Sequence, residues 1–102
     1  MMTRIYSIAE EVGAARTFQS TTNGIPTDVK VVGLLLTDGK NKLYAEAFRE
    51  RADLVEKLQL QKGDIVELHL STNATCREKD GNKFYNNMVS VDGIMLVVRN
   101  SF

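Results

Sequence analysis

The segment that decides the fold spans residues 28–49 and reads DVKVVGLLLTDGKNKLYAEAFR. Residues 28–37 are rich in Val and Leu on both alternating faces, which indicates a strand that is covered on both sides. The Asp38-Gly39 pair then favours a hairpin with a type I′ turn. In residues 42–49, Leu and Ala alternate with polar and aromatic residues, which is typical of a return strand with one buried face. We therefore expect two adjacent antiparallel strands here.

The segment after this hairpin changes from alternating to helical spacing. Residues 50–60 carry apolar side chains at intervals of three and four, which predicts a short amphipathic helix. Gly63 is suited to end the helix or to form the turn that follows it. The expected buried face consists of Ala52, Leu54, Val55 and Leu58.

Three further segments have the pattern of β-strands. A short strand is expected over residues 3–8, with Ile5 and Tyr6 at its centre. Residues 65–72 alternate between polar and apolar side chains, which predicts a strand with one buried face. Residues 84–98 form the last extended stretch, which we expect to be interrupted near Asp92-Gly93.

Two connecting segments are expected to be loops, and the conformation of one segment stays open. Residues 18–27 contain no charged residue but do contain the turn-forming pair Asn23-Gly24 and a proline, which indicates a loop. Residues 76–83 predict a charged hairpin loop centred on Asp80-Gly81. Residues 9–18 have Glu and Ala that favour helix, but an internal glycine and an extended end, so helix and strand both stay open.

The order of these elements predicts the fold class. A strand, a loop, a β-hairpin, a helix and a second β-hairpin follow one another along the chain. We therefore expect an all-β protein with one short helix, a five-stranded Greek-key barrel of the OB-fold type. The helix lies between strands three and four. The length of 102 residues suits a single domain over residues 1–102.

The composition argues against several classes of function. Thirteen Lys and Arg residues balance thirteen Asp and Glu residues, so the net charge gives no strong attraction to polyanions. Because Cys76 and His69 are each single, no intrachain disulfide forms and a metal cluster or a Ser-His site lacks partners. We therefore expect no enzymatic activity, no metal and no cofactor.

The sequence also gives an expectation about location. The amino-terminal residues lack the apolar core of a signal peptide. The longest apolar run, residues 31–36, is far too short to cross a bilayer. We therefore expect a cytoplasmic protein without membrane contact.

Four short motifs link this chain to a known family. They are TNGIP at residues 22–26, AEAFR at 45–49, LQKGD at 60–64 and KDGNKFY at 79–85. In this order they resemble segments of the bacterial single-stranded-DNA-binding protein family and, more loosely, of the related primosomal protein N group. The resemblance covers residues 18–98 and implies an OB-fold that stacks the bases of single-stranded DNA, or of RNA, on aromatic side chains with little sequence preference.

The aromatic positions of that family are only partly kept. Phe48 and Tyr85 match, and the resemblance places Tyr85 outward and its neighbour Phe84 inward. The chain contains no Trp, and the family's common Trp positions fall on Lys42 and Cys76. The resemblance therefore extends further for the fold than for the stacking residues.

The candidate binding residues combine aromatic and basic side chains. Tyr44 and Phe48 share one face of the expected strand, where they either stack bases or cover a neighbouring strand or a second copy. The cations of residues 76–83 either contact phosphates or form an ordinary solvated hairpin, since Glu78 and Asp80 interleave with them. The predicted nucleic-acid-binding residues are Lys42, Tyr44, Phe48, Arg49, Arg51, Arg77, Lys79, Lys83 and Tyr85.

A second surface is predicted on the strand over residues 28–37. Val32, Leu34 and Leu36 share one face, and we expect them to need cover that one small barrel does not supply. They are therefore the predicted interface of a homo-oligomer, a dimer or a tetramer.

Two hypotheses from different classes follow. The leading one is a non-enzymatic protein that binds single-stranded DNA, or RNA, during replication, repair or recombination. The alternative is an OB-fold module for protein interaction or oligomeric scaffolding, without nucleic-acid binding. Under the alternative, Phe48→Ala disturbs assembly or stability more than nucleic-acid affinity.

Overall fold

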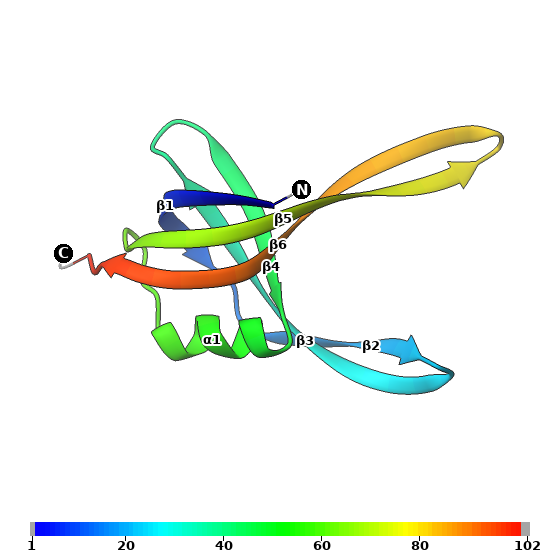
Figure 1. Ribbon diagram of the computed structural model, residues 1–102, viewed down its shortest axis with the longest axis horizontal. Helices are drawn as coiled ribbons and strands as arrows, with labels where there is room; N and C mark the ends of the chain where they lie inside the picture. The colour runs from blue at the N-terminus through cyan, green and yellow to red at the C-terminus, as the bar shows by residue number, and fades with distance from the viewer. Residues whose placement is uncertain (1, 101–102) are drawn as a thin grey trace.

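The computed structural model describes residues 2–100, which form six strands and one helix (Figure 1). No helix within this range has the length and apolar character needed to cross a membrane. The elements are β1 (Met2–Val12), β2 (Arg16–Thr22), β3 (Ile25–Thr37), β4 (Lys42–Phe48), α1 (Glu50–Leu58), β5 (Ile65–Lys79) and β6 (Asn82–Val98).

Five of the strands close into a barrel. β1 pairs antiparallel with β5 over residues 2–8 and with β3 over residues 8–12. β3 continues antiparallel to β4, β4 meets β6 in parallel at Glu46 and Ser90, and β6 returns antiparallel to β5. With α1 between the third and fourth barrel strands, this is the OB-fold, and the predicted fold class is confirmed.

The sixth strand, β2, is a continuation of the first barrel strand. Residues 13–15 separate β1 from β2, and β2 then pairs only with the outer half of β3. The amide of Gly13 donates to the carbonyl of Gly33 at 2.9 Å and keeps this break close to β3. Residues 9–18, which the sequence left open, are therefore extended on both sides of a short break.

The inward side chains of β3 form the centre of the core. Val32, Leu34 and Leu36 are 1%, 0% and 1% exposed, and they pack with Ala and Val side chains of β4, α1, β5 and β6. The prediction that these three side chains need cover from a second copy is wrong. The barrel and its helix already remove them from water, so they have no surface left for an oligomer interface.

Two predicted loops are instead paired strands. Residues 18–27 belong to the β2–β3 hairpin, because β-prone Thr, Phe and Ile residues lie on both sides of the Asn23-Gly24 turn. Residues 76–83 likewise continue β5 and β6, with only Asp80-Gly81 unpaired. In both turns the two central residues have positive φ, 53° and 77° in one and 52° and 79° in the other, as a type I′ turn requires.

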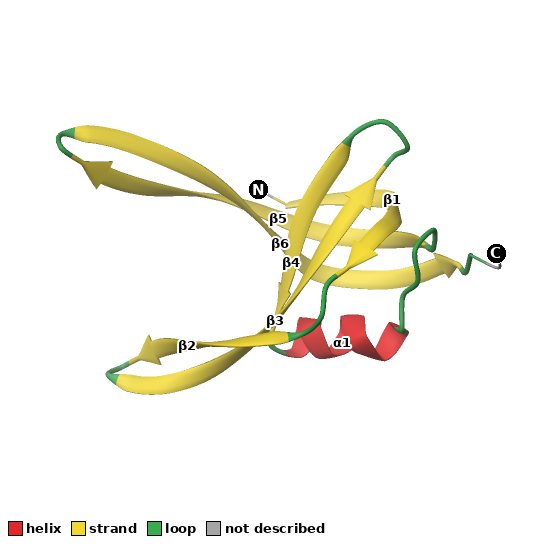
Figure 2. Ribbon diagram, turned by 180° about the vertical axis from the view of Figure 1, so that it is seen from behind, coloured by secondary structure: helices red, strands yellow, loops and turns green. Residues whose placement is uncertain are grey.

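These two hairpins project from the same side of the barrel as long arms (Figures 1 and 2). We call residues 16–31 the β2–β3 arm and residues 72–89 the β5–β6 arm. At the base of the β5–β6 arm, His69 pairs with Gly93 and Leu70 with Val91. Asp92 is therefore an extra residue in β6, which confirms the predicted interruption near this position.

The β3–β4 turn lies where the sequence predicts it but has a different conformation. Of its central pair only Gly39 has positive φ, at 100°, so the turn is not type I′. The Asp38 carboxylate accepts hydrogen bonds from the amides of Asn41 and Lys40 at 2.7 and 2.9 Å, and these bonds, that of Asn41 most, lower its pKa. Side-chain hydrogen bonds therefore determine this turn, and glycine alone supplies the left-handed residue.

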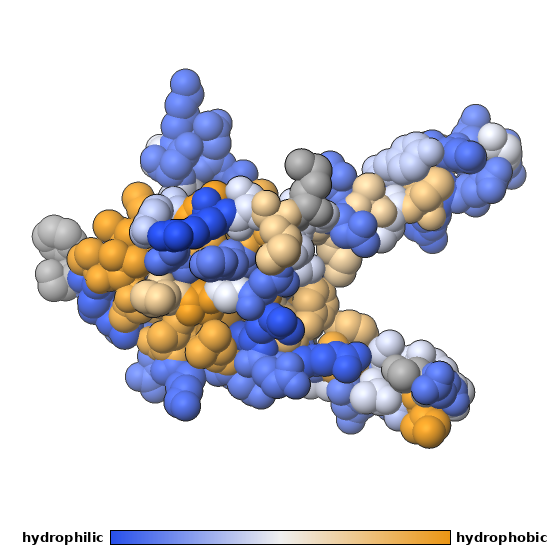
Figure 3. Space-filling model, in the orientation of Figure 1, coloured by the Kyte–Doolittle hydropathy of each residue, from blue (hydrophilic) through white to orange (hydrophobic). Residues whose placement is uncertain are grey.

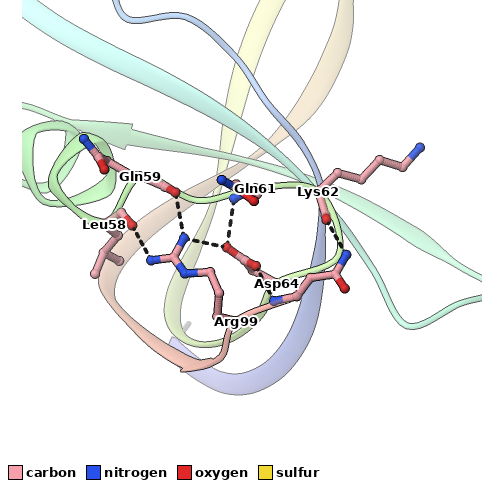
Figure 4. A network of polar contacts seen from close by, with 7 residues as sticks. Leu58, Gln59, Gln61, Lys62, Asp64 and Arg99 are labelled. Carbon is pink, nitrogen blue, oxygen red and sulfur yellow. Dashed lines mark hydrogen bonds and ion pairs between the residues drawn. The ribbon is translucent and has the colours of Figure 1, made fainter. Parts of the chain in front are cut away.

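The helix and the last strand are joined by a polar network around the buried Asp64 (Figure 4). Its carboxylate accepts hydrogen bonds from the amides of Gln61 and Asn100, at 2.8 and 2.7 Å, and from Arg99 Nη1 at 3.1 Å. The amide of Gln61 contributes most to lowering the pKa of Asp64, and Asn100 and Arg99 add to it. Arg99 also donates to the carbonyl oxygens of Leu58 and Gln59, which α1 leaves unpaired at its end.

One helix residue departs from its predicted environment. Ala52 and Val55 are buried, as expected, and Leu58 is half-buried. Leu54 is exposed instead, because the helix turns only a narrow face toward the barrel. The helix ends with Gln59 in the left-handed conformation, so Gly63 forms the following turn and does not end the helix.

Candidate nucleic-acid interface

The outer face of β2, β3 and β4 brings together aromatic and charged side chains. Strand register places Val31 of β3 between Arg16 of β2 and Phe48 of β4, and Leu35 beside Tyr44. Because side chains on paired strands alternate together, these residues all point away from the barrel core. Tyr44 and Phe48 share this face, as the sequence predicts. Glu46 lies between them, and Lys42 lies on the other side of Tyr44.

An aromatic pair covers the part of this face nearest the β2–β3 arm. The rings of Phe18 and Phe48 lie 6.4 Å apart at an interplanar angle of 88°, an edge-to-face contact. Val29 and Val31 face the same side and are 3% and 0% exposed, although they lie outside the barrel core. The arm thus has a small apolar cluster of its own, and Phe18 remains substantially exposed above it.

Beside this pair, Tyr44 lies across a glycine and reaches a charged pair. A Cβ atom on Gly33 would come within 2.8 Å of Tyr44 Cζ, so only glycine lets the tyrosine lie flat here. Arg16 Nη2 donates to Glu46 Oε2 at 2.6 Å. The Tyr44 hydroxyl and then the Glu46 carboxylate raise the pKa of Arg16.

The other predicted residues of β4 and α1 have different surroundings. Lys42 Nζ forms an ion pair with Glu10 Oε1 at 3.0 Å. Arg49 has a positive φ of 58°, and its side chain is exposed at the junction of β4 and α1. Arg51 Nε donates to the carbonyl of Asp92 at 3.1 Å, so this side chain is held against β6 and not beside Tyr44 and Phe48.

The predicted residues of the β5–β6 arm are divided between its two faces. Register pairs Arg77 with Phe84, whereas Lys83 lies opposite Glu78 and Tyr85 lies opposite Cys76. Arg77 and Lys79 therefore share the Phe84 face, and Lys83 and Tyr85 occupy the other face. The four residues do not form one cluster.

Both aromatic residues of this arm are exposed. Phe84 is 54% and Tyr85 is 66% exposed, so the expectation that Phe84 faces inward is wrong. The arm extends beyond the barrel, where neither of its faces has a core to cover it, and the space-filling view shows open space between the two arms (Figure 3).

The two faces of the β5–β6 arm carry different charged residues. Strand register places Arg77 and Lys79 with uncharged residues on the Phe84 face. A hollow of about 430 Å³ on the arm is lined by Arg77, Lys79, Phe84 and Asn86, and Glu78 also borders it. Within residues 2–100, Arg77, Lys79 and Lys83 take part in no ion pair. These cations are therefore available to a ligand.

Two residues of this surface were missed in the sequence. Arg16 and Phe18 lie in segments that were left open or predicted to be a loop. The signal was present, because β-prone residues flank Asn23-Gly24 on both sides, and such a pair between two β-prone runs predicts a hairpin. The described part of the chain contains no group of three or more His, Cys, Asp or Glu side chains that could hold a metal ion.

Comparison with known proteins shows the fold but no family. No family model and no curated protein matches the chain. Among solved structures, the second OB-fold domain of replication protein A from Methanococcus maripaludis is 18% identical with a TM-score of 0.63. That alignment covers 98% of this chain and 87% of the domain.

A second similar protein is Rim1, the mitochondrial single-stranded DNA binding protein of S. cerevisiae. Two of its crystal structures match at 12% and 15% identity, with TM-scores of 0.55 and 0.53. Each alignment covers 98% of this chain and 99% of the other. At these identities the likeness concerns the OB-fold itself, which these archaeal and mitochondrial proteins share; membership of the bacterial family stays a prediction.

Proposed function

We propose that this chain binds single-stranded nucleic acid along the outer face of β2, β3 and β4 and the β5–β6 arm. The observation that carries the proposal is the set of exposed rings and unpaired cations on the face and arm that OB-folds use for oligonucleotides. Similar solved structures of single-stranded-DNA-binding proteins support it as well.

Stacking supplies the larger part of the proposed affinity. Tyr44 and the Phe18–Phe48 pair offer rings on one continuous face, where a stacked base contributes about 1–3 kcal/mol. Stacking is tolerant of sequence, because every base has a flat π-face. We therefore expect binding with little overall sequence preference.

Phosphate contacts are assigned to the unpaired cations. The net charge is zero, but Lys30 alone pairs with both Asp53 and Glu56, which leaves cations elsewhere without an anionic partner. Arg77 and Lys79 face solvent together on the Phe84 face, without an ion pair within residues 2–100. Arg77 and Lys79 can therefore contact phosphates although the chain as a whole is neutral.

The first experiment is fluorescence anisotropy of a labelled oligo-dT of about 30 nucleotides at several salt concentrations. Binding should weaken as salt rises. Each single-strand phosphate contact contributes about 0.7 to the slope of log K against log salt, so the double variant Arg77→Ala/Lys79→Ala should reduce that slope by about 1.4. The matched control is Lys57→Ala/Lys62→Ala, which removes the same charge from exposed lysines of α1 and the loop after it.

Two results would contradict the proposal. Absence of binding at tens of micromolar protein at low salt would remove nucleic acid as the ligand. Equal slopes for the two double variants would mean that the arm does not contact phosphates. An oligo-dU of the same length, tested in parallel, distinguishes DNA from RNA.

The proposal places the protein, without enzymatic activity, among those that handle single strands in replication, repair or recombination in the cytoplasm. A homo-oligomer remains part of the proposal, with an interface other than Val32, Leu34 and Leu36. Sedimentation equilibrium of the full chain tests it, and a monomer over the whole concentration range would exclude it.

A second candidate function is an OB-fold module for protein interaction. The observation that favours it is the exposed apolar side chains on the arms, with Phe84 and Met88 on one and Ile25 near the tip of the other. Phe48→Ala tests this candidate, because the ring packs edge-to-face on Phe18. A loss of assembly or stability with unchanged oligonucleotide affinity would favour the interaction module.

A further inference from the structure

We infer that a small hollow beside Tyr44 accepts one base of the bound strand and prefers guanine. This inference rests on the proposed function and adds a position of base selectivity to an otherwise sequence-tolerant surface. The hollow has a volume of about 220 Å³ and is lined by Glu11, Gly13, Arg16, Gly33, Leu35 and Tyr44.

The floor of the hollow is made of backbone. Gly13 and Gly33 lie against each other, with the Gly13 amide donating to the Gly33 carbonyl at 2.9 Å. A Cβ atom on Gly13 would lie 3.4 Å from that carbonyl oxygen, and one on Gly33 would collide with Tyr44. The two glycines therefore allow the two backbones and the Tyr44 ring to approach one another closely at this side of the hollow.

Its walls carry a donor and an acceptor. Arg16 is held by Glu46 through Nη2 and has further N–H groups, since a guanidinium has five. On the other side, the exposed carboxylate of Glu11 has no hydrogen-bond or ion-pair partner within residues 2–100. The hollow thus presents an oriented cation, a free anion and the Tyr44 ring with its hydroxyl.

A β-bulge is responsible for the place of Glu11. Ala9 pairs with Leu36 and Glu11 pairs with Leu35, so Glu10 is an extra residue in β1. Without the bulge, Glu11 would alternate with Ala9 and face the core; with it, Glu11 faces outward beside Leu35 and Tyr44. Bulges often direct a side chain toward a binding site, and this one directs Glu11 to the edge of the aromatic face.

Among the bases, guanine fits this combination best. It offers the O6 and N7 acceptors that arginine binds, together with amino and imino N–H donors for a carboxylate. Thymine has no amino group, adenine has no carbonyl, and cytosine has an amino group but no neighbouring ring N–H that could make a second bond to the carboxylate. The hollow is also smaller than the roughly 300–1,000 Å³ pockets of larger ligands, so it suits one base.

The test compares four oligonucleotides of about 15 nucleotides that differ at one central position. One is all dT, and the others carry a single dG, dC or dA in place of the central dT. By anisotropy at fixed salt, we expect the dG oligonucleotide to bind at least about five-fold more tightly than dT. Glu11→Gln should abolish this preference, so that the dG and dT oligonucleotides bind equally, whereas the control Glu50→Gln, an exposed glutamate on α1, should retain it.

A second measurement locates the base. An oligonucleotide with 6-thioguanine at the central position should photo-crosslink to the peptide that contains Tyr44 or Arg16. A crosslink confined to other peptides, or equal affinities for all four oligonucleotides, would overturn the inference and leave the proposed function standing. Failure to bind any of the four would instead contradict the proposed function.

Free GMP is the last probe, because a free nucleotide carries the same base. GMP is not expected to displace a bound oligonucleotide, since it lacks the contacts of the neighbouring bases with Phe18 and Phe48. Displacement by GMP that is lost in Glu11→Gln would assign the hollow to a free nucleotide and overturn the inference.

Discussion

β5 and β6 run through both the barrel and the β5–β6 arm, yet their side chains have opposite environments in these two regions. Within the barrel, Val66, Leu68 and Leu70 of β5 are buried, and the residues between them are not. Beyond the barrel, all residues from 73 to 88 are exposed on both faces. Regular alternation therefore identifies a strand, but only its neighbours decide whether either face is covered.

The two arms also differ from each other. The β2–β3 arm has Val29 and Val31 buried beneath Phe18 and Phe48, whereas the β5–β6 arm has no comparable cluster among its described residues. An isolated two-stranded hairpin has only marginal stability in water. The β5–β6 arm thus depends on its attachment to the barrel for its stability.

The largest expected effect contrasts the core with the arm. Leu34→Ala removes a fully buried side chain and should lower the free energy of unfolding by about 3 kcal/mol. Met88→Ala, on the exposed arm, should change it by less than about 0.5 kcal/mol. Urea unfolding followed by circular dichroism measures both, and a similar loss for both variants would show that the arm is packed.

A smaller effect on the free energy of unfolding is expected at Asp64, whose hydrogen bonds connect the end of the helix to the last strand. Asp64→Asn replaces an acceptor of three hydrogen bonds with an amide and should lower the free energy of unfolding by about 2 kcal/mol at neutral pH. Because the folded-state pKa of Asp64 is lowered, its contribution is complete above the ordinary carboxyl pKa and is lost as pH falls through the folded pKa. Wild type and variant should therefore converge in acid, and a pH-independent difference would assign the effect to packing.

The smallest expected effect compares the two faces of the β5–β6 arm. Phe84→Ala should weaken oligo-dT binding by about 1 kcal/mol, or about five-fold, because Phe84 shares its face with Arg77 and Lys79. Tyr85→Ala should have little effect, since its face pairs Lys83 with Glu78. Both rings are exposed, so neither variant should alter the unfolding midpoint. The reverse order of affinities would place the strand on the Tyr85 face.

Local sequence was sufficient for the elements whose signals are local. The alternation of residues 42–48 placed Tyr44 and Phe48 together, and helical spacing located α1. The positions of all three hairpin turns also follow from Asx-Gly pairs. Val32, Leu34 and Leu36 were correctly placed on one face, but that pattern does not reveal that the same barrel covers them.

The rest depends on contacts between residues far apart in the chain. The extra residue at Glu10 and the meeting of Arg16 with Glu46 across thirty positions require strand register that no local pattern encodes. Sequence by itself located the five barrel strands, the positions of the turns and the helix, and hence the OB-fold, but it did not predict β2 or the outer parts of β5 and β6. Only the tertiary structure decided which faces are buried and which charges remain free, because burial and ion pairing depend on what packs opposite each strand.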